Sequence, residues 1–203
     1  MNISRDSIKK AVKTCIVELV HNFQSQPYSF LFESDIQAYL YASLRSRLSE
    51  PLKVHGSGNP ENVYNTGIVH TEYWKRIDIV CLDPESEQWS KKRTFRGSDL
   101  HIYELPILVG IELKYCKMGD IFGLSSCIAD LEKLNAHKIK YPVALGFLQN
   151  RSYEEAFFAG LSHQYECIDV SDIDPFGFHV ISPGKVWKIH ISQIAKFDKN
   201  ESQ

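Results

Sequence analysis

The heptapeptide GIELKYC, residues 110–116, governs how the rest of the chain is interpreted. It closes the apolar run LPILVGIELKYC, which has the length and composition of a buried strand. Side chains two positions apart on a strand share a face, so Glu112 and Lys114 should stand side by side. Burying either charge without a partner is costly. The two charges therefore either neutralise each other or share a third partner, such as a metal ion or a phosphate.

The bulk composition favours one folded domain. The chain has 203 residues, of which 43% are hydrophobic and 12% aromatic, enough for a real core. We expect a single α/β domain over residues 1–203. With a net charge of −2, the chain does not grip a polyanion through overall charge. Any nucleic-acid binding must then depend on a local basic patch or on metal ions.

Cysteine usage and the N-terminus indicate the compartment. The five cysteines include no CxxC pair and no Cys/His cluster at zinc spacing, which is typical of buried thiols in a reducing environment. The N-terminus lacks the apolar core of a signal peptide, and no run approaches membrane-spanning length. We expect a cytoplasmic protein that does not enter a membrane.

Hydrophobic periodicity predicts the order of the elements. Helices are expected at about 4–23, where Ser4 can cap the first turn, and at 33–48, which Pro51 closes. A further helix is expected over 117–134 and another over 152–165. Strands are expected at 62–74, at 75–83, in the motif stretch and at 141–148, and the segments FGFHVIS and KVWKIHIS should form a closing hairpin.

Two more carboxylates fall among apolar neighbours. Asp78 interrupts the strand RIDIVCL, which precedes the motif strand. Glu33 opens the second helix and shares the core-facing side of the helical wheel with Ile36 and Leu40. Each carboxylate has an ordinary explanation: Asp78 as the partner of a neighbouring cation, and Glu33 as a residue favoured by the helix dipole. Together with Glu112, they make a set of oxygen ligands suited to Mg²⁺ or Mn²⁺.

These motifs resemble the PD-(D/E)xK nuclease superfamily. The resemblance covers roughly residues 28–149 and lies in FESDIQAYLYASL, RIDIVCL, VGIELKY and ADLEKL. The Pro that names the motif is replaced by Ile77, and an insertion at 84–100 is required. The implied fold is a restriction-endonuclease-like αβββαβ core with a mixed central sheet flanked by helices. An N-terminal helix at 4–24 and a C-terminal extension at 150–198 would be added to this core.

The resemblance also implies a reaction. Asp78, Glu112 and the backbone carbonyl of Leu113 would hold the metal ion. Lys114 would orient the attacking water or help to deprotonate it, and Glu33 would complete the ligand shell. The implied function is hydrolysis of phosphodiester bonds in nucleic acid, with DNA as the expected substrate, by a water that Mg²⁺ or Mn²⁺ activates.

Other charged residues are weaker candidates. The cations Lys91, Lys92, Arg93 and Arg96 of KKRTFR suit a phosphate backbone, although such a run is equally typical of a solvated loop. Lys133, Lys138 and Lys140 either extend that surface or are ordinary exposed lysines. Glu72 is a further acidic candidate near the site.

Two alternatives remain open. A non-catalytic binding or assembly subunit could keep the fold, with the acidic cluster as a structural ion-pair network around Lys114. An enzyme acting on a small phosphorylated substrate has less support, because no glycine-rich phosphate loop is present. If duplex DNA is cut on both strands, we expect a homodimer, since one site addresses one strand.

Overall fold

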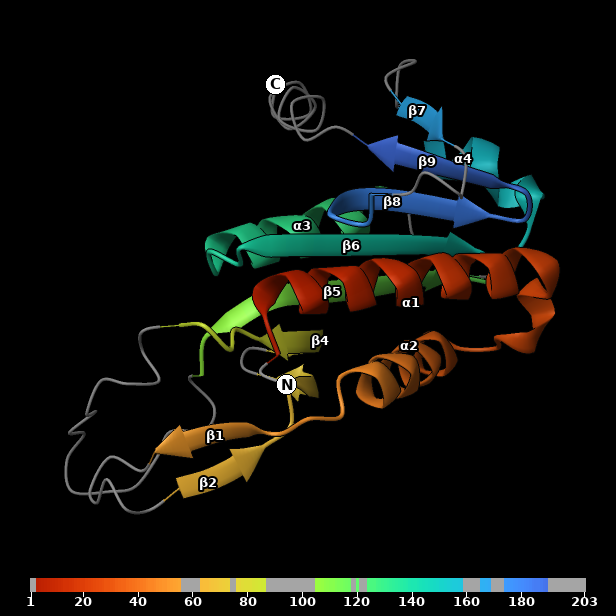
Figure 1. Cartoon of the computed structure of the whole chain (residues 1–203). Coiled ribbons are helices and arrows are strands. Elements are labelled where there is room, and N and C mark those ends of the chain that lie inside the picture. Colours follow the sequence, from red (N-terminus) through yellow and green to blue (C-terminus); the bar gives the residue numbers. More distant parts are fainter. Residues whose placement is uncertain are drawn as a thin grey trace, which may run out of the picture.

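The structure, a computed structural model, describes residues 3–55, 63–73, 76–86, 105–117, 120, 124–158, 165–168 and 174–189. Its α-helices are α1 (Arg5–Ser25), α2 (Glu33–Arg47), α3 (Leu124–Ala136) and α4 (Glu154–Phe158), and it has 3₁₀ turns η1 (Pro27–Ser29) and η4 (Arg151–Tyr153) (Figure 1). The strands are β1 (Leu52–His55), β2 (Val63–Thr66), β3 (Val69–Tyr73), β4 (Ile77–Leu82), β5 (Ile107–Cys116), β6 (Tyr141–Leu148), β7 (Tyr165–Ile168), β8 (Gly177–Ser182) and β9 (Lys185–Ile189).

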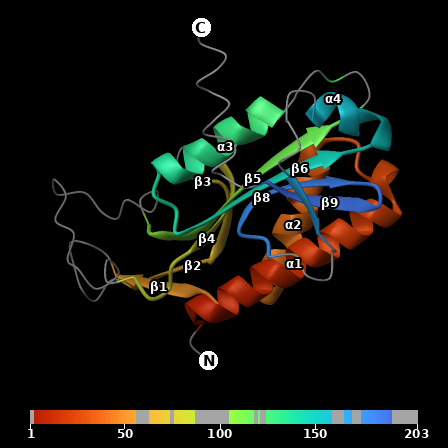
Figure 2. The same cartoon turned by 90° about the horizontal axis from the view of Figure 1, so that it is seen from above.

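One mixed sheet organises the chain. Among the described residues it has seven strands in the order β3-β4-β5-β6-β8-β9-β7. The neighbours β5–β6 and β6–β8 are parallel, and the other pairs are antiparallel. Helices α1 and α2 lie on one face of this sheet and α3 on the other (Figure 2). The predicted α/β class and the mixed sheet flanked by helices are confirmed.

Helix α1 forms where the sequence predicts it. Ser4 caps the helix by accepting a hydrogen bond from the backbone N–H of Ser7. The helix then places one apolar stripe against the sheet, and all of its members are fully buried: Ile8, Val12, Cys15, Ile16, Leu19, Val20 and Phe23. The predicted N-terminal helix is therefore confirmed.

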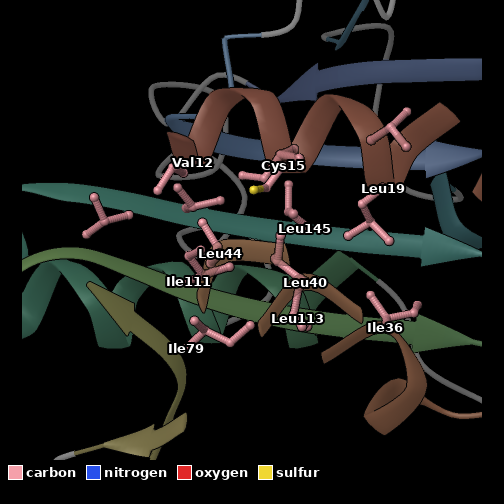
Figure 3. Close-up of a cluster of buried hydrophobic side chains, with 14 of the residues drawn as sticks. Val12, Cys15, Leu19, Ile36, Leu40, Leu44, Ile79, Ile111, Leu113 and Leu145 are labelled. Carbon is pink, nitrogen blue, oxygen red and sulfur yellow. The ribbon is translucent and has the colours of Figure 1, made fainter. Parts of the chain in front are cut away.

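The main core lies between α1, α2 and the sheet, as Figure 3 shows. Helix α2 contributes the predicted stripe of Ile36, Leu40 and Leu44, each with no exposed surface. Strand β5 sends Ile111 and Leu113 into the same cluster. The intervening residues of β5, Glu112 and Lys114, therefore face the opposite side of the sheet, toward α3.

Glycines on the central strands allow α3 to lie close to the sheet. A Cβ atom at Gly110 of β5 would come within 2.9 Å of the Leu134 side chain of α3. A Cβ atom at Gly146 of β6 would come within 3.3 Å of Cys127 Sγ, also on α3. The glycine just before the E-x-K motif thus allows α3 to approach the charged residues that follow it.

The prediction of one strand over 62–74 is wrong. This segment forms two strands, β2 and β3, which separate at Gly67. Strand β2 leaves the main sheet and pairs with β1, a strand that the sequence analysis did not predict. A glycine lacks a side chain to pack in a strand, and here it marks the point where the chain changes pairing partner.

The prediction of a helix over 152–165 is wrong at its last residue, Tyr165, and residues 159–164 lie outside the described residues. Helix α4 covers Glu154–Phe158, and Tyr165 already begins β7. Pairing with β9 at the edge of the sheet overrides the helical pattern of the sequence here. The predicted closing hairpin is confirmed, since β8 and β9 pair antiparallel from Phe178 and Ile189 to Ser182 and Lys185.

None of the helices in the described residues is both long enough and apolar enough to cross a bilayer.

Candidate active site

Strand β5 extends beyond the start of its neighbour β4, and carboxylates line the edge that is left. The antiparallel register pairs Ile79 with Ile111, and β4 begins at Ile77 whereas β5 continues to Cys116. In this region the N–H of Leu113 donates to Asp78 Oδ2 at 2.7 Å, and the N–H of Tyr115 donates to Glu33 Oε2 at 3.1 Å. The next N–H on the same edge, that of Lys117, donates to Asp120 Oδ2 at 3.0 Å. Side-chain carboxylates thus take the place of a neighbouring strand.

Asp78 is held at the point where the two strands separate. Continuing the register by one residue places Asp78 opposite Glu112. The N–H and C=O of one strand residue point to the same side, so the carbonyl of Leu113 also faces the edge that Asp78 caps. Burial raises the pKa of Asp78, although the Leu113 N–H and the Lys114 ammonium oppose the shift.

Glu33 reaches the same edge from the first turn of α2. Burial raises its pKa, Lys114 opposes this shift, and Asp78 adds to it. One turn later, Gln37 donates its Nε2–H to the backbone carbonyl of Asp78 at 2.9 Å. The same amide lies 3.3 Å from Glu72 Oε1. The start of α2 therefore contributes both a carboxylate and an amide to the site.

Glu112 is the most deeply buried acid of this group. Its side chain is only 3% exposed, and Lys133 Nζ of α3 lies 2.7 Å from its Oε1. Burial raises the pKa of Glu112 to about 7 in spite of this lysine, with a smaller contribution from Asp78. A buried carboxylate with such a pKa favours the arrival of a further positive charge.

Lys114 also pairs across to α3. Its Nζ lies 3.3 Å from Asp130 Oδ2, and both side chains are partly buried. Burial lowers the pKa of Lys114, but Glu33 and Asp130 outweigh it and the net shift is upward. Lys114 is therefore an ammonium at neutral pH. It can orient a water or a phosphate and offset negative charge, which favours the first of its two expected roles over proton abstraction.

The alternative in which Glu112 and Lys114 neutralise each other does not hold. Each finds its counter-charge on α3: Glu112 on Lys133, and Lys114 on Asp130. Asp130 was not predicted as a site residue, and Lys133 was considered only as part of a surface. The signal that could have found them is the spacing Asp-x-x-Lys, which puts both side chains on one helix face opposite the Glu-x-Lys strand face.

Glu72 lies beside this cluster in an unusual backbone conformation. Its φ is 50°, in the left-handed region that few side-chain-bearing residues adopt. The residue sits at the end of β3 and is exposed, and its negative charge contributes to raising the pKa of Asp78. Strained residues concentrate at functional sites, so this conformation agrees with the acidic candidate that the sequence suggested.

The oxygen atoms of this site are of the chemical type that binds a hard divalent cation, but they are not arranged around a common point in this structure. Three carboxylates and a carbonyl are oxygen ligands of the type that Mg²⁺ uses. In the described ranges, however, no three Asp, Glu, His or Cys side chains form a group that could hold a metal ion. Buried Glu112 Oε1 and Asp130 Oδ2 accept no well-formed hydrogen bond from any described residue, and each is matched only by an ammonium group. Lys133 occupies the position beside Glu112 that a cation would need.

The basic residues predicted from the sequence lie partly outside the described part of the chain. Lys91, Lys92, Arg93 and Arg96 lie outside the described residues, so the basic surface stays a prediction. Lys138 and Lys140 are exposed and follow the end of α3.

Comparison with models of known families, with curated proteins and with solved structures found no match for this chain.

Proposed function

We propose that the protein is a divalent-metal-dependent nuclease that hydrolyses phosphodiester bonds, with DNA as the expected substrate. The observation that carries the proposal is the meeting of Asp78, Glu112 and Lys114 where β4 and β5 separate, with Glu33 of α2 on the same edge. The order α2–β3–β4–β5–α3–β6, with the β1–β2 pair inserted after α2 and with β6 parallel to β5, agrees with a restriction-endonuclease-like αβββαβ core. Both features support the PD-(D/E)xK interpretation of the sequence.

Asp78, Glu112 and the carbonyl of Leu113 would hold the metal ion. Bound there, Mg²⁺ or Mn²⁺ supplies an activated water and offsets charge on the phosphate. Glu33 remains on the Tyr115 N–H and keeps the end of β5 in place while adding negative charge to the site. These residues would bind the metal ion and hold β5 in place, and the lysines would orient the water and offset the negative charge of the phosphate.

Lys114 and Lys133 would divide that work. Asp130 holds the Lys114 ammonium at 3.3 Å, where it faces the same side of the sheet as Glu112. Lys133 must leave Glu112 before that carboxylate can act as a ligand, and its Nζ has a second contact, 2.7 Å from the Arg76 carbonyl, that can retain it nearby. Lys133 would then be a cation beside the substrate phosphate.

The direct test is cleavage of plasmid, linear duplex and single-stranded DNA with Mn²⁺ or Mg²⁺, against EDTA. We expect metal-dependent cutting by the wild type that is lost in Glu112→Gln and Lys114→Met. Glu132→Gln on the exposed side of α3 and Lys13→Met on α1 are matched controls of the same chemistry, and both should cut normally. Cutting that survives in both site variants would refute the assignment.

The second candidate function is a non-catalytic binding or assembly subunit. The specific observation in its favour is that the site charges are already paired, Glu112 with Lys133 and Lys114 with Asp130. Calorimetric titration with Mn²⁺ separates the two functions. Uptake that Glu112→Gln abolishes supports the nuclease, whereas no uptake together with no cutting supports the ion-paired subunit.

The oligomeric state and the cellular location of the protein are also proposed from this function. Cutting both strands of a duplex calls for two sites related by two-fold symmetry, so we expect a homodimer on such a substrate. Sedimentation velocity with and without a short duplex measures this directly. We expect a cytoplasmic location, because DNA and reduced cysteine thiols are found together in that compartment.

A further inference from the structure

A group of large apolar side chains is exposed immediately before the site. Tyr28, Leu31 and Phe32 are 64%, 57% and 55% exposed, and all three lie in the short link between α1 and α2. Among the described residues they are the large hydrophobic side chains that face solvent. A group of exposed apolar side chains of this kind is typical of a binding surface.

The link that carries these side chains is fixed in place. The carboxylate of Asp35 accepts the N–H groups of both Leu31 and Phe32, at 2.8 and 2.9 Å. Between the exposed residues, Phe30 is buried, and its carbonyl accepts a hydrogen bond from the Tyr115 hydroxyl of β5. The exposed rings are therefore held on a rigid backbone, which lowers the entropy lost when a ligand binds.

The same link leads directly into the candidate active site. Phe32 precedes Glu33, whose carboxylate holds the N–H of Tyr115. Two residues beyond Tyr115 at the end of β5, the Lys117 ammonium lies 4.2 Å from the centre of the Phe32 ring. The surface formed by Tyr28, Leu31, Phe32 and Lys117, which we call the aromatic platform, thus lies next to the contact between Glu33 and the end of β5.

We infer that the aromatic platform binds unpaired nucleobases of the strand that enters the site. Aromatic faces next to a cation are the chemistry that single-stranded nucleic acid requires, because bases stack on the ring and the ammonium meets a phosphate. The nearby carboxylates of Asp35 and Asp120 accept backbone N–H groups, which fixes their positions, and the Lys117 ammonium is the cation available to a phosphate. The inference rests on the proposed nuclease function and narrows its substrate to single strands, ends or flaps.

The test is binding in EDTA, which separates recognition from cleavage. Fluorescence anisotropy is measured with a short oligo(dT), with a blunt duplex and with the same duplex bearing a single-stranded overhang. We expect oligo(dT) and the overhang to bind more tightly than the blunt duplex. An oligonucleotide containing 2-aminopurine should show quenched fluorescence when its base stacks on a ring.

Variants at Phe32 separate stacking from simple apolar contact. Phe32→Leu keeps an apolar side chain without a ring and should weaken oligo(dT) binding about tenfold, while Phe32→Trp should retain it. Lys117→Met should lower the dependence of log affinity on log salt by about 0.7, the value for one phosphate contact on a single strand. Because the Phe32 ring is exposed, melting temperatures should match the wild type.

Each outcome decides between the possibilities. Unchanged oligo(dT) binding in Phe32→Leu, or a wild type that prefers the blunt duplex, would overturn the platform. A change in self-association in Phe32→Leu, seen by sedimentation without DNA, would also overturn it and identify a protein interface. Ring-dependent binding of oligo(dT) without metal-dependent cutting would leave the platform standing and refute the nuclease.

Discussion

Lys133 Nζ of α3 lies 2.7 Å from Oε1 of Glu112, the most buried carboxylate of the candidate site. An ammonium group and a divalent metal ion compete for the same oxygen. The strength of this ion pair therefore controls how readily Glu112 becomes available as a ligand.

Replacing Lys133 should strengthen metal binding. Without the ammonium, Glu112 is left buried and unpaired, and a cation then relieves a larger desolvation penalty. We expect Lys133→Met to bind Mn²⁺ about tenfold more tightly by calorimetry and to gain more in melting temperature from Mn²⁺ than the wild type. Lys13→Met, on the exposed side of α1, is the control. Equal Mn²⁺ affinity in all three proteins would mean that Lys133 does not compete with the metal.

Neutralising Glu112 should stabilise the metal-free protein at alkaline pH. The folded-state pKa of Glu112 is raised to about 7, above its ordinary value of 4.5. The contribution of Glu112 to folding stability is therefore fully present below pH 4.5 and is lost as pH rises through about 7. We expect Glu112→Gln to raise the free energy of unfolding by about 1–3 kcal/mol at pH 8 and by nothing at pH 4.5. Urea unfolding in EDTA measures this, with Glu132→Gln as a control that should show no such difference.

His179 of β8 should make the fold sensitive to acid. Its ring is fully buried, and neither ring nitrogen has a hydrogen-bond partner among the described residues. Burial lowers its pKa to about 4, the Lys188 ammonium adds to this shift, and Asp174 opposes it. The unfolded chain takes up the proton near pH 6.5, so stability is complete above that pH and falls as pH drops toward 4.

The measurement for His179 is a comparison of two pH curves. Between pH 7 and pH 4 the wild type should lose about 3 kcal/mol of unfolding free energy relative to His179→Leu, which has no proton to bind there. Parallel curves for the two proteins would show that His179 takes up its proton equally in the folded and unfolded states.

Asp130 should act on catalysis through Lys114. It lies 3.3 Å from the Lys114 ammonium and helps to keep that pKa raised. We expect Asp130→Asn to slow cleavage about 10- to 100-fold with little change in Mn²⁺ affinity. Because the Lys114 pKa falls when this charge is removed, the alkaline limb of the pH–rate profile should also move to lower pH. A slower variant with an unmoved alkaline limb would assign Asp130 a purely structural role.

The parts of the site that lie on strands and helix stripes could be predicted from the sequence. The alternation of VGIELKY gives Glu112 and Lys114 a common face, and the apolar stripe of α2 places Glu33 toward the sheet. The edge contacts of Asp78 and Glu33 with β5 agree with these expectations.

The partners of those residues could not be predicted. Local periodicity makes Glu112 and Lys114 neighbours, but it says nothing of the helix that packs over them. Asp130 and Lys133 reach the motif because Gly110 lets α3 approach β5, which is a property of tertiary packing. Gln37 was missed for the same reason: its contact with the Asp78 carbonyl depends on how α2 packs against the start of β4.

The carboxylates along β5 also protect the protein from other chains. An apolar strand with free N–H groups at an open edge is a template for pairing with a strand of another molecule. At Leu113 and Tyr115 these groups are taken by Asp78 and Glu33, whose charges repel an incoming backbone. Truncating either acid to alanine would expose an aggregation-prone edge as well as remove a carboxylate of the candidate site. The isosteric amides Asp78→Asn and Glu33→Gln are therefore the variants that separate loss of chemistry from loss of solubility.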